Sequence, residues 1–427
     1  MSWIALFVAV CLTRLHCRKV QRALALSKFI LKLGDFMFYI GVDIAKCNHE
    51  ASIIDSSGKA LSESLSFSNS VKGLEKFQKF ISSFSLSNDN CVIGMEATGH
   101  YWLSLYSFLT DLGFSCVVIN PIQSDAFRKM YIRQTKNDAV DSFVIAQILR
   151  FGEYSISNFS DEDTFALRNL SRYRFALVDE ASDWKRKLVA ILDQVFPEYD
   201  KLFSNIYGVA SKELLSKYPL PEDMISIPAS SLAELLSKSS KGRFGIDKAK
   251  EIQDAASNTF GIKFALRSFS FQIKQIINQI SFLEEQILEI ENEIKIMLDQ
   301  LCPVITSITG IGPILGAAIF SEIGDIKRFD KANQLVAYAG LDVAVKQSGN
   351  FVATNTKISK HGSPYLRRAI WLASIVAAFK DPALSLYYQK LRERGKAHGT
   401  AIGAVARKLT NIIFAVLRDN KAYIPNI

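Results

Sequence analysis

Apolar and polar positions follow a strand-like period in the first third of the chain and a helix-like period after it. Short apolar runs bounded by turn residues predict strands at 38–42, 51–55, 61–67, 91–95 and 114–119. Helical spacing predicts helices near 71–84, 100–112, 125–130 and 138–149. The N-terminal part is therefore an α/β domain in which three antiparallel strands precede alternating strands and helices. That order is typical of an RNase H-like fold, in which the first and fourth strands are neighbours.

The pattern is helical at 161–197 and mixed, rich in serine and lysine, at 198–262, where we expect a small helical insertion. The most regular part of the chain follows and has a period of seven. Isoleucines stand at 273, 280, 287 and 294, and apolar residues repeat in the same way at 276, 283, 290 and 297. Four heptads with apolar a and d positions predict a coiled-coil helix. Isoleucine at both positions disfavours a plain parallel dimer, so we expect pairing with helix 161–197 of the same chain together with contact to another subunit. A long core helix within one domain accounts for the pattern equally well.

A segment of small and apolar residues follows at 304–318, with Gly310 and Gly312 at its centre. Two helices joined by a turn with glycines two apart predict a helix-hairpin-helix, whose exposed backbone N–H groups can hold a phosphate without reading bases. A tight turn used only for packing is the alternative. A further helix is predicted to start near Ser363.

These patterns predict an α/β domain at 37–155, a helical coiled-coil region at 160–300 with an insertion at 198–262, and a mainly α C-terminal domain at 301–427. Residues 1–36 contain an apolar run that is too short to span a bilayer, and basic residues follow it instead of preceding it. We interpret residues 1–36 as an upstream extension, explained by a start-site artefact, and not as a membrane anchor.

The positive charge of the chain is concentrated in one segment. Between Lys346 and Lys408 there are twelve Lys or Arg and two acidic residues, whereas the whole chain has a net charge of +9. A basic domain attached to a nearly neutral body favours a polyanionic partner, of which nucleic acid is the commonest. A basic surface that only keeps the protein soluble is the alternative.

Cysteine and histidine are arranged in ways that exclude two kinds of site. The six cysteines are scattered without a CxxC pair, which predicts a reduced cytoplasmic protein without structural zinc. The five histidines form no HxxxH pair, so a histidine-ligated metal is not expected.

Acidic residues end two predicted strands and begin one predicted helix. Asn137 is a helix cap, and Asp138 and Asp141 share a face of the first turn, where carboxylates are favoured. A capped, solvated helix start explains that pair alone. Asp43 and Glu96, however, end the first and fourth strands, which are neighbours in this fold. Four converging carboxylates suit divalent cations such as Mg²⁺ that bridge a phosphodiester.

Ordered sequence blocks resemble those of a known family. They are YIGVDIAK at 39–46, GMEATGHYW at 94–102, INP at 119–121, KNDAVDS at 136–142, ITGIGP at 308–313, FDKANQLVAYAGL at 329–341, KQSG at 346–349 and KISKHGSPYLRRAIW at 357–371. In these blocks the chain resembles the DEDD transposases of bacterial insertion sequences, the IS-one-ten family. Such proteins join a RuvC-type, RNase H-like domain to a C-terminal transposase domain.

The resemblance implies more than the residues alone indicate. It maps the acidic quartet of Mg²⁺ ligands onto Asp43, Glu96, Asp138 and Asp141, and the catalytic serine onto Ser348. It implies that Ser348 attacks a DNA phosphodiester and holds the cut strand, that a structured noncoding RNA guides the reaction, and that the protein is a homo-oligomer, a dimer or tetramer. Without the resemblance, Ser348 reads as a turn serine before Gly349. A hydroxyl needs activation, so Ser348 must reach an acidic cluster, its own or that of another subunit.

Three other functions are compatible with parts of the pattern. A metal-dependent nuclease or junction resolvase needs only the carboxylates, with water as the nucleophile. A catalytically inactive nucleic-acid-binding protein needs only the basic domain. A sugar- or acetate-kinase-like protein also begins with a strand like IGVDI, but here Ala45-Lys46-Cys47 takes the place of the glycine-rich phosphate loop, which argues against ATP.

Overall fold

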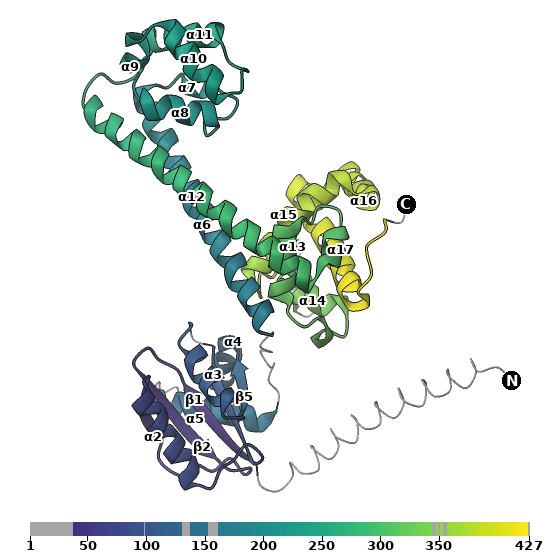
Figure 1. Cartoon of the computed structure of the whole chain (residues 1–427). Coiled ribbons are helices and arrows are strands. Elements are labelled where there is room, and N and C mark those ends of the chain that lie inside the picture. Colours follow the sequence, from purple (N-terminus) through teal and green to yellow (C-terminus); the bar gives the residue numbers. More distant parts are fainter. Residues whose placement is uncertain are drawn as a thin grey trace, which may run out of the picture. The chain divides into compact units, whose positions relative to one another are not determined.

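The computed structural model describes residues 37–97, 99–129, 137–152, 161–343, 347–348, 351–352 and 357–425. The chain divides into two compact units, residues 1–158 and 159–427, which are described separately (Figure 1). The interpretation of residues 1–36 concerns a segment outside the described residues.

The N-terminal unit contains a five-stranded mixed sheet with the order β3-β2-β1-β4-β5. Its strands are β1 (Phe38–Asp43), β2 (Asn48–Ile54), β3 (Leu65–Ser68), β4 (Cys91–Glu96) and β5 (Ser115–Ile119). β1 is antiparallel to β2 and parallel to β4, with Gly41 opposite Gly94. The predicted neighbourhood of the first and fourth strands is confirmed, and the order is compatible with an RNase H-like domain.

Four helices cover the two faces of this sheet. They are α2 (Val71–Ser83), α3 (Trp102–Asp111), α4 (Pro121–Arg128) and α5 (Asp138–Phe151). Ile40 and Ile93 share a core cluster with α2 and α3, whereas α4 and α5 pack with Tyr39 and Val92 on the other side. Because side chains alternate along a strand, Asp43 and Glu96 belong to the side of the sheet that α5 covers.

The contact between α5 and the sheet is unusually close at β1. A Cβ on Gly41 would stand 2.0 Å from the carbonyl oxygen of Ser142 and 2.4 Å from the backbone nitrogen of Ala146, so only glycine fits there. The hydroxyls of Ser52 and Ser142 form a buried hydrogen bond of 2.7 Å that ties α5 to β2 as well. These contacts place the start of α5 beside the end of β1.

The second unit is built on two long helices, α6 (Glu162–Val195) and α12 (Leu266–Leu301), which pack against each other (Figure 1). Ile273, Ile276, Ile280 and Leu283 of the predicted heptads are buried. Pairing within the chain is therefore confirmed, and contact with another subunit stays a prediction. Leu288 is 58% exposed and lies off the heptad seam.

The segment between the two long helices is helical, as predicted. It contains α7 (Tyr199–Leu202), α8 (Val209–Lys217), α9 (Pro221–Ser226), α10 (Ala229–Ser239) and α11 (Ile246–Ser257). These helices share a core with the ends of α6 and α12 that are nearest to them in the chain, where Leu188 and Ile273 are fully buried.

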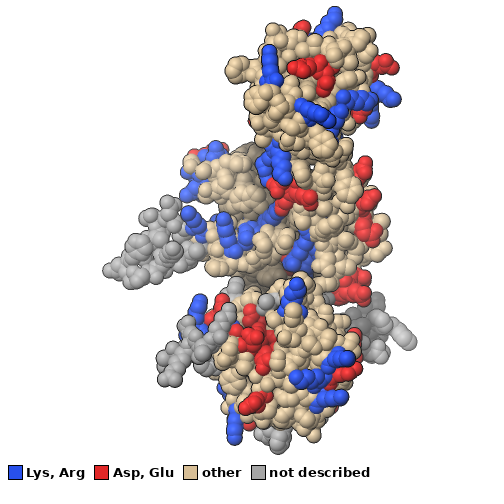
Figure 2. Space-filling model, turned by 90° about the vertical axis from the view of Figure 1, so that its left-hand side faces the viewer, with Lys and Arg blue, Asp and Glu red and all other residues tan. Residues whose placement is uncertain are grey.

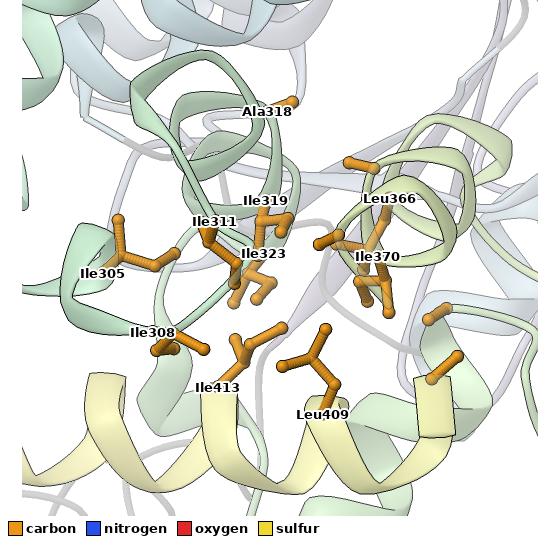
Figure 3. Packing of buried hydrophobic residues seen from close by; sticks show 14 of the residues in the cluster. Ile305, Ile308, Ile311, Ala318, Ile319, Ile323, Leu366, Ile370, Leu409 and Ile413 are labelled. Atoms are coloured by element: carbon orange, nitrogen blue, oxygen red, sulfur yellow. The ribbon is translucent and has the colours of Figure 1, made fainter. Parts of the chain in front are cut away.

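The C-terminal part folds around the other end of α6 and α12. Its elements are the 3₁₀ helices η1 (Pro303–Ser307) and η2 (Ile326–Arg328), the helices α13 (Pro313–Ile323), α14 (Ala332–Tyr338), α15 (Pro364–Lys380), α16 (Pro382–Glu393) and α17 (His398–Asp419), and the short strands β6 (Gln347–Ser348) and β7 (Phe351–Val352). Figure 3 shows Ile319, Ile370 and Ile413, from α13, α15 and α17, pointing toward one another in the core.

The predicted helix-hairpin-helix has a different local structure. The short 3₁₀ helix η1, and not an α-helix, precedes the turn. Gly310 has φ +91, and a Cβ there would stand 2.6 Å from the carbonyl oxygen of Ala373 in α15. The turn packs closely on α15, as expected if it is a tight packing turn and not a phosphate-binding hairpin.

Among the described residues, α17 is the single helix long and apolar enough by composition to cross a membrane. Half of its most apolar window is buried inside the unit, and Leu409 and Ile413 belong to the core. A buried core helix explains that composition.

Candidate active site

The structure places four acidic residues at element ends on the side of the N-terminal sheet that α5 covers. Asp43 ends β1, and Glu96 ends β4, the parallel neighbour of β1. Asp138 and Asp141 lie in the first turn of α5. The side-chain oxygen of Asn137 accepts a hydrogen bond of 2.8 Å from the backbone N–H of Val140, so the predicted cap is confirmed.

Asp43 interacts electrostatically with the other three carboxylates. Burial, followed by the charges of Asp141, Asp138 and Glu96, raises the pKa of Asp43 from 3.8 to about 6. Burial and neighbouring negative charges both disfavour the ionised form of a carboxyl group. A nearby cation would relieve this repulsion.

Helix α4 supplies two contacts to this cluster. The hydroxyl of Ser124 donates a hydrogen bond of 2.9 Å to Oε2 of Glu96, and Nε of Arg128 lies 3.1 Å from Oδ1 of Asp141. Nη1 of Arg128 also donates to Asp125 at 3.1 Å. Neither Ser124 nor Arg128 was among the site residues predicted from the sequence. The available signal was their spacing of four, which puts both on one face of the helix that follows β5.

The cluster has the donor chemistry of a divalent-cation site. Carboxylate oxygens are the preferred ligands of Mg²⁺. Oδ1 of Asp141 is buried and makes no well-aligned hydrogen bond, although it is close to Arg128. In the part of the chain that the structure describes, no three acidic, histidine or cysteine side chains converge closely enough to form a finished metal site. The four carboxylates nevertheless fit a divalent cation by their donor chemistry.

Ser348 lies in the other unit. It ends β6 and pairs with Phe351 of β7 across a short antiparallel connection. The ends of this segment are tied by a bridge between Val343 and Ile358 and by a hydrogen bond of 2.8 Å from the N–H of Ser359 to the carbonyl of Asp342. The side chain of Ser348 is outside the described residues. The structure thus groups the four carboxylates and leaves Ser348 on a separate element.

Basic side chains are exposed along the C-terminal helices. Exposed lysines and arginines lie at the end of α15, along the last turn of α16 and into α17: Lys380, Lys390, Arg392, Arg394, Lys396 and Lys408. Nζ of Lys408 lies 4.1 Å from the ring centre of Tyr387, so a cation and an aromatic ring occur together there. On the face drawn in Figure 2, both units carry Lys and Arg, and the N-terminal unit shows a cluster of acidic side chains. The basic segment is suited to a polyanion.

Comparison with known proteins points to one family across both units. A model of DEDD transposases of the IS110 type, described as "Transposase", matches residues 40–197. A second model, described as "Transposase IS116/IS110/IS902 family", matches residues 302–389.

Full-length relatives give the same result. An uncharacterized 43.6 kDa protein of insertion element IS110 from Streptomyces coelicolor is 24% identical over 91% of this chain and 96% of its own. The pilin gene-inverting protein of Moraxella bovis is 24% identical, with 90% and 97% covered. The transposase for insertion sequence element IS1111A from Coxiella burnetii is also 24% identical, with 90% of each chain covered. Matches to both units, in chain order and over nearly the whole length, leave one conclusion: the chain belongs to the IS110 family of transposases.

Proposed function

We propose that this protein cuts and rejoins DNA with a metal-binding acidic quartet and a serine nucleophile, under the guidance of a noncoding RNA. In this proposal the N-terminal unit is an RNase H-like, RuvC-type domain. The observation that supports it is the neighbouring placement of Asp43, Glu96, Asp138 and Asp141: burial, followed by the charges of the other three carboxylates, raises the pKa of Asp43 to about 6. Membership of a transposase family makes DNA the substrate of that cluster.

The quartet would hold Mg²⁺. When bound, such an ion polarises a phosphoryl oxygen and stabilises the charge that develops on the oxygens around phosphorus. Ser124 holds Glu96 in place, and the cap of Asn137 fixes the first turn of α5 with its two aspartates. The protein thereby orients the carboxylates before the substrate arrives.

Ser348 would be the nucleophile. Its Oγ forms a bond to phosphorus, the bond from phosphorus to one DNA oxygen breaks, and the proton of the hydroxyl ends on that leaving oxygen. The cut strand is then held as a phosphoserine until a DNA hydroxyl reverses the reaction. This role rests on the KQSG block at 346–349, which resembles the family pattern. A serine hydroxyl needs an activating base or metal, which the quartet can provide only if the two are brought together.

The partners follow from charge and from relatives. The exposed basic residues from Lys380 to Lys408 provide a surface for nucleic acid, DNA or the guide RNA. The name of the pilin gene-inverting relative describes inversion of a DNA segment, which requires cutting and rejoining at two places. Two sites handled at once favour a homo-oligomer, a dimer or a tetramer.

A pair of substitutions tests the chemistry. Ser348→Ala should abolish both strand exchange and the covalent protein–DNA adduct, and Asp141→Asn should abolish all cutting. Ser268→Ala, an exposed serine of the same unit, is the matched control. If Ser348→Ala still cuts DNA in Mg²⁺, the protein is a nuclease or resolvase that uses water. If Asp141→Asn retains full activity, the acidic quartet has no catalytic role.

The guided part of the proposal needs its own experiment. The full chain is expressed with the DNA that flanks its gene, purified, and its bound RNA is sequenced. We expect one structured RNA to be recovered far above the cellular background, and a recombination assay in Mg²⁺ should depend on it. Recovery of no specific RNA, or recombination without it, would remove the guide from the proposal.

A further inference from the structure

We infer that Arg128 is a built-in counter-ion of Asp141 that competes with the divalent cation for this carboxylate and so sets the metal affinity of the acidic site. The inference rests on the proposed metal-binding role of the quartet. It assigns a function to a residue of α4 that lies outside the four carboxylates themselves.

Arg128 lies beside Oδ1 of Asp141. Among the described residues, this is the one buried carboxylate oxygen of the quartet that lacks a well-aligned hydrogen bond. Nε of Arg128 lies 3.1 Å from Oδ1 of Asp141, and both side chains are largely shielded, with 21% and 9% of their surface exposed. Neither atom makes a hydrogen bond of good geometry to any partner. The two groups are therefore held together by charge, without the alignment that makes a buried ion pair strong.

The surroundings explain why a cation is needed at this place. Burial and then the charge of Asp141 raise the pKa of Asp43, which places Asp141 near a second carboxylate. A buried carboxylate beside others of its kind is unfavourable unless a positive charge is near. Arg128 supplies that charge in the metal-free protein, and Mg²⁺ would supply it in the loaded one.

Arg128 also has a second partner to which it can turn. Nη1 donates to Asp125, one turn back on α4, at 3.1 Å, and the side chain of Asp125 is 66% exposed. When a cation takes Asp141, the guanidinium can keep its contact with Asp125 and move toward solvent. The displaced guanidinium is then hydrated and still paired with Asp125, so its release from Asp141 has a small cost in free energy.

Metal titration of the full chain without DNA tests the inference. Binding of MgCl₂, and of MnCl₂ as a second probe, is measured by calorimetry at pH 8 in 0.1 M KCl. Arg128→Gln should bind the metal about tenfold more tightly than the unmodified protein, which corresponds to about 1.4 kcal/mol. Lys129→Gln removes the same charge from the adjacent, exposed position and should change the affinity by less than about twofold.

The outcomes separate this inference from the proposed function. If the unmodified protein binds no metal, the metal site of the proposed function fails. If it binds metal and Arg128→Gln binds equally or more weakly, Arg128 is not a competitor and the inference is wrong, while the metal site stands.

A measurement on the unmodified chain does not depend on how the variant folds. Because Nε of Arg128 is buried against Asp141, its N–H should exchange slowly with solvent in the metal-free protein. Nuclear magnetic resonance of arginine-labelled protein, with the signal assigned from Arg128→Lys, should show exchange accelerating at least several-fold when Mg²⁺ is added. Unchanged exchange at saturating Mg²⁺ would contradict displacement.

Discussion

Gly41 and Gly94 stand opposite each other on the parallel strands β1 and β4, and α5 packs over both of them. At Gly41 the neighbours are backbone atoms of Ser142 and Ala146, and at Gly94 the neighbour is the side chain of Leu149. Because neither glycine has a side chain, α5 can approach the sheet closely at these two positions. Asp43 and Glu96 follow two residues later on each strand, so the same approach brings them near the first turn of α5.

Gly41→Ala should destabilise the N-terminal unit strongly. The added Cβ would meet backbone atoms at 2.0 and 2.4 Å, which can be relieved only by moving the whole helix. We expect a loss of about 3 kcal/mol or more in the free energy of unfolding, measured by urea denaturation.

Gly94→Ala is the matched comparison for this prediction. There the Cβ would meet Cδ1 of Leu149 at 2.7 Å, and a leucine side chain can turn away. The expected loss is about 1 kcal/mol. Equal effects of the two substitutions would show that α5 adjusts freely over β1.

Asp43→Asn should stabilise the metal-free protein at high pH. The folded-state pKa of Asp43, about 6, lies above its ordinary value of 3.8. Its contribution to stability is therefore fully present below about pH 3.8 and is lost as the pH rises through 6. In EDTA, we expect the Tm of the variant to exceed that of the unmodified protein at pH 8, with a clearly smaller difference at pH 5.

Asp55→Asn provides a control of opposite sign. Hydrogen bonds from the Ser57 hydroxyl and from the backbone N–H of Lys59 lower the pKa of Asp55, so its charged form stabilises the turn. This substitution should lower the Tm at pH 8 and have less effect in acid. A Tm of Asp43→Asn that is lower than that of the unmodified protein at pH 8 would contradict the crowding of the four carboxylates.

Ser124→Ala should weaken metal binding, opposite in direction to Arg128→Gln. Ser124 is 1% exposed, and its hydroxyl donates a hydrogen bond of 2.9 Å to Oε2 of Glu96. Loss of a group that orients a ligand typically costs about tenfold or more in metal affinity. Mg²⁺ calorimetry measures the effect, and Ser83→Ala, an exposed serine of the same unit, should leave the affinity unchanged. Tighter binding by Ser124→Ala would exclude an orienting role.

Glu322→Gln should destabilise the helical unit. Glu322 is 2% exposed on α13 and accepts hydrogen bonds from Arg172 at 2.5 and 3.1 Å and from the hydroxyl of Ser363 at 2.7 Å. Removing its charge leaves a half-buried guanidinium without compensation, so we expect a loss of about 3 kcal/mol in thermal or chemical unfolding.

An exposed ion pair of the same unit gives the contrast. Lys217 and Glu213 lie 2.8 Å apart, and their side chains are 53% and 42% exposed. Glu213→Gln should change the free energy of unfolding by less than about 1 kcal/mol, because water screens that pair. A similar loss in both variants would mean that burial does not set the strength of the Glu322 interactions.

Local patterns were sufficient to predict most of the elements. Short apolar runs predicted β1, β4 and β5, the heptads predicted α12, and Asn137 before two aspartates located the start of α5. Element ends were less certain: α4 begins at Pro121, earlier than predicted, because proline suits the first helical position. The strand predicted at 61–67 is limited to Leu65–Ser68.

The sequence by itself determined that β1 and β4 end in acidic residues and that α5 begins with two of them, because each of these features depends only on a few neighbouring residues. Only the tertiary structure decided which side chains meet that cluster. Ser124 and Arg128 reach Glu96 and Asp141 because α4 packs beside α5, a contact between segments that no local period encodes. Asp141 thereby gains Arg128, a partner that exists only once the chain is folded.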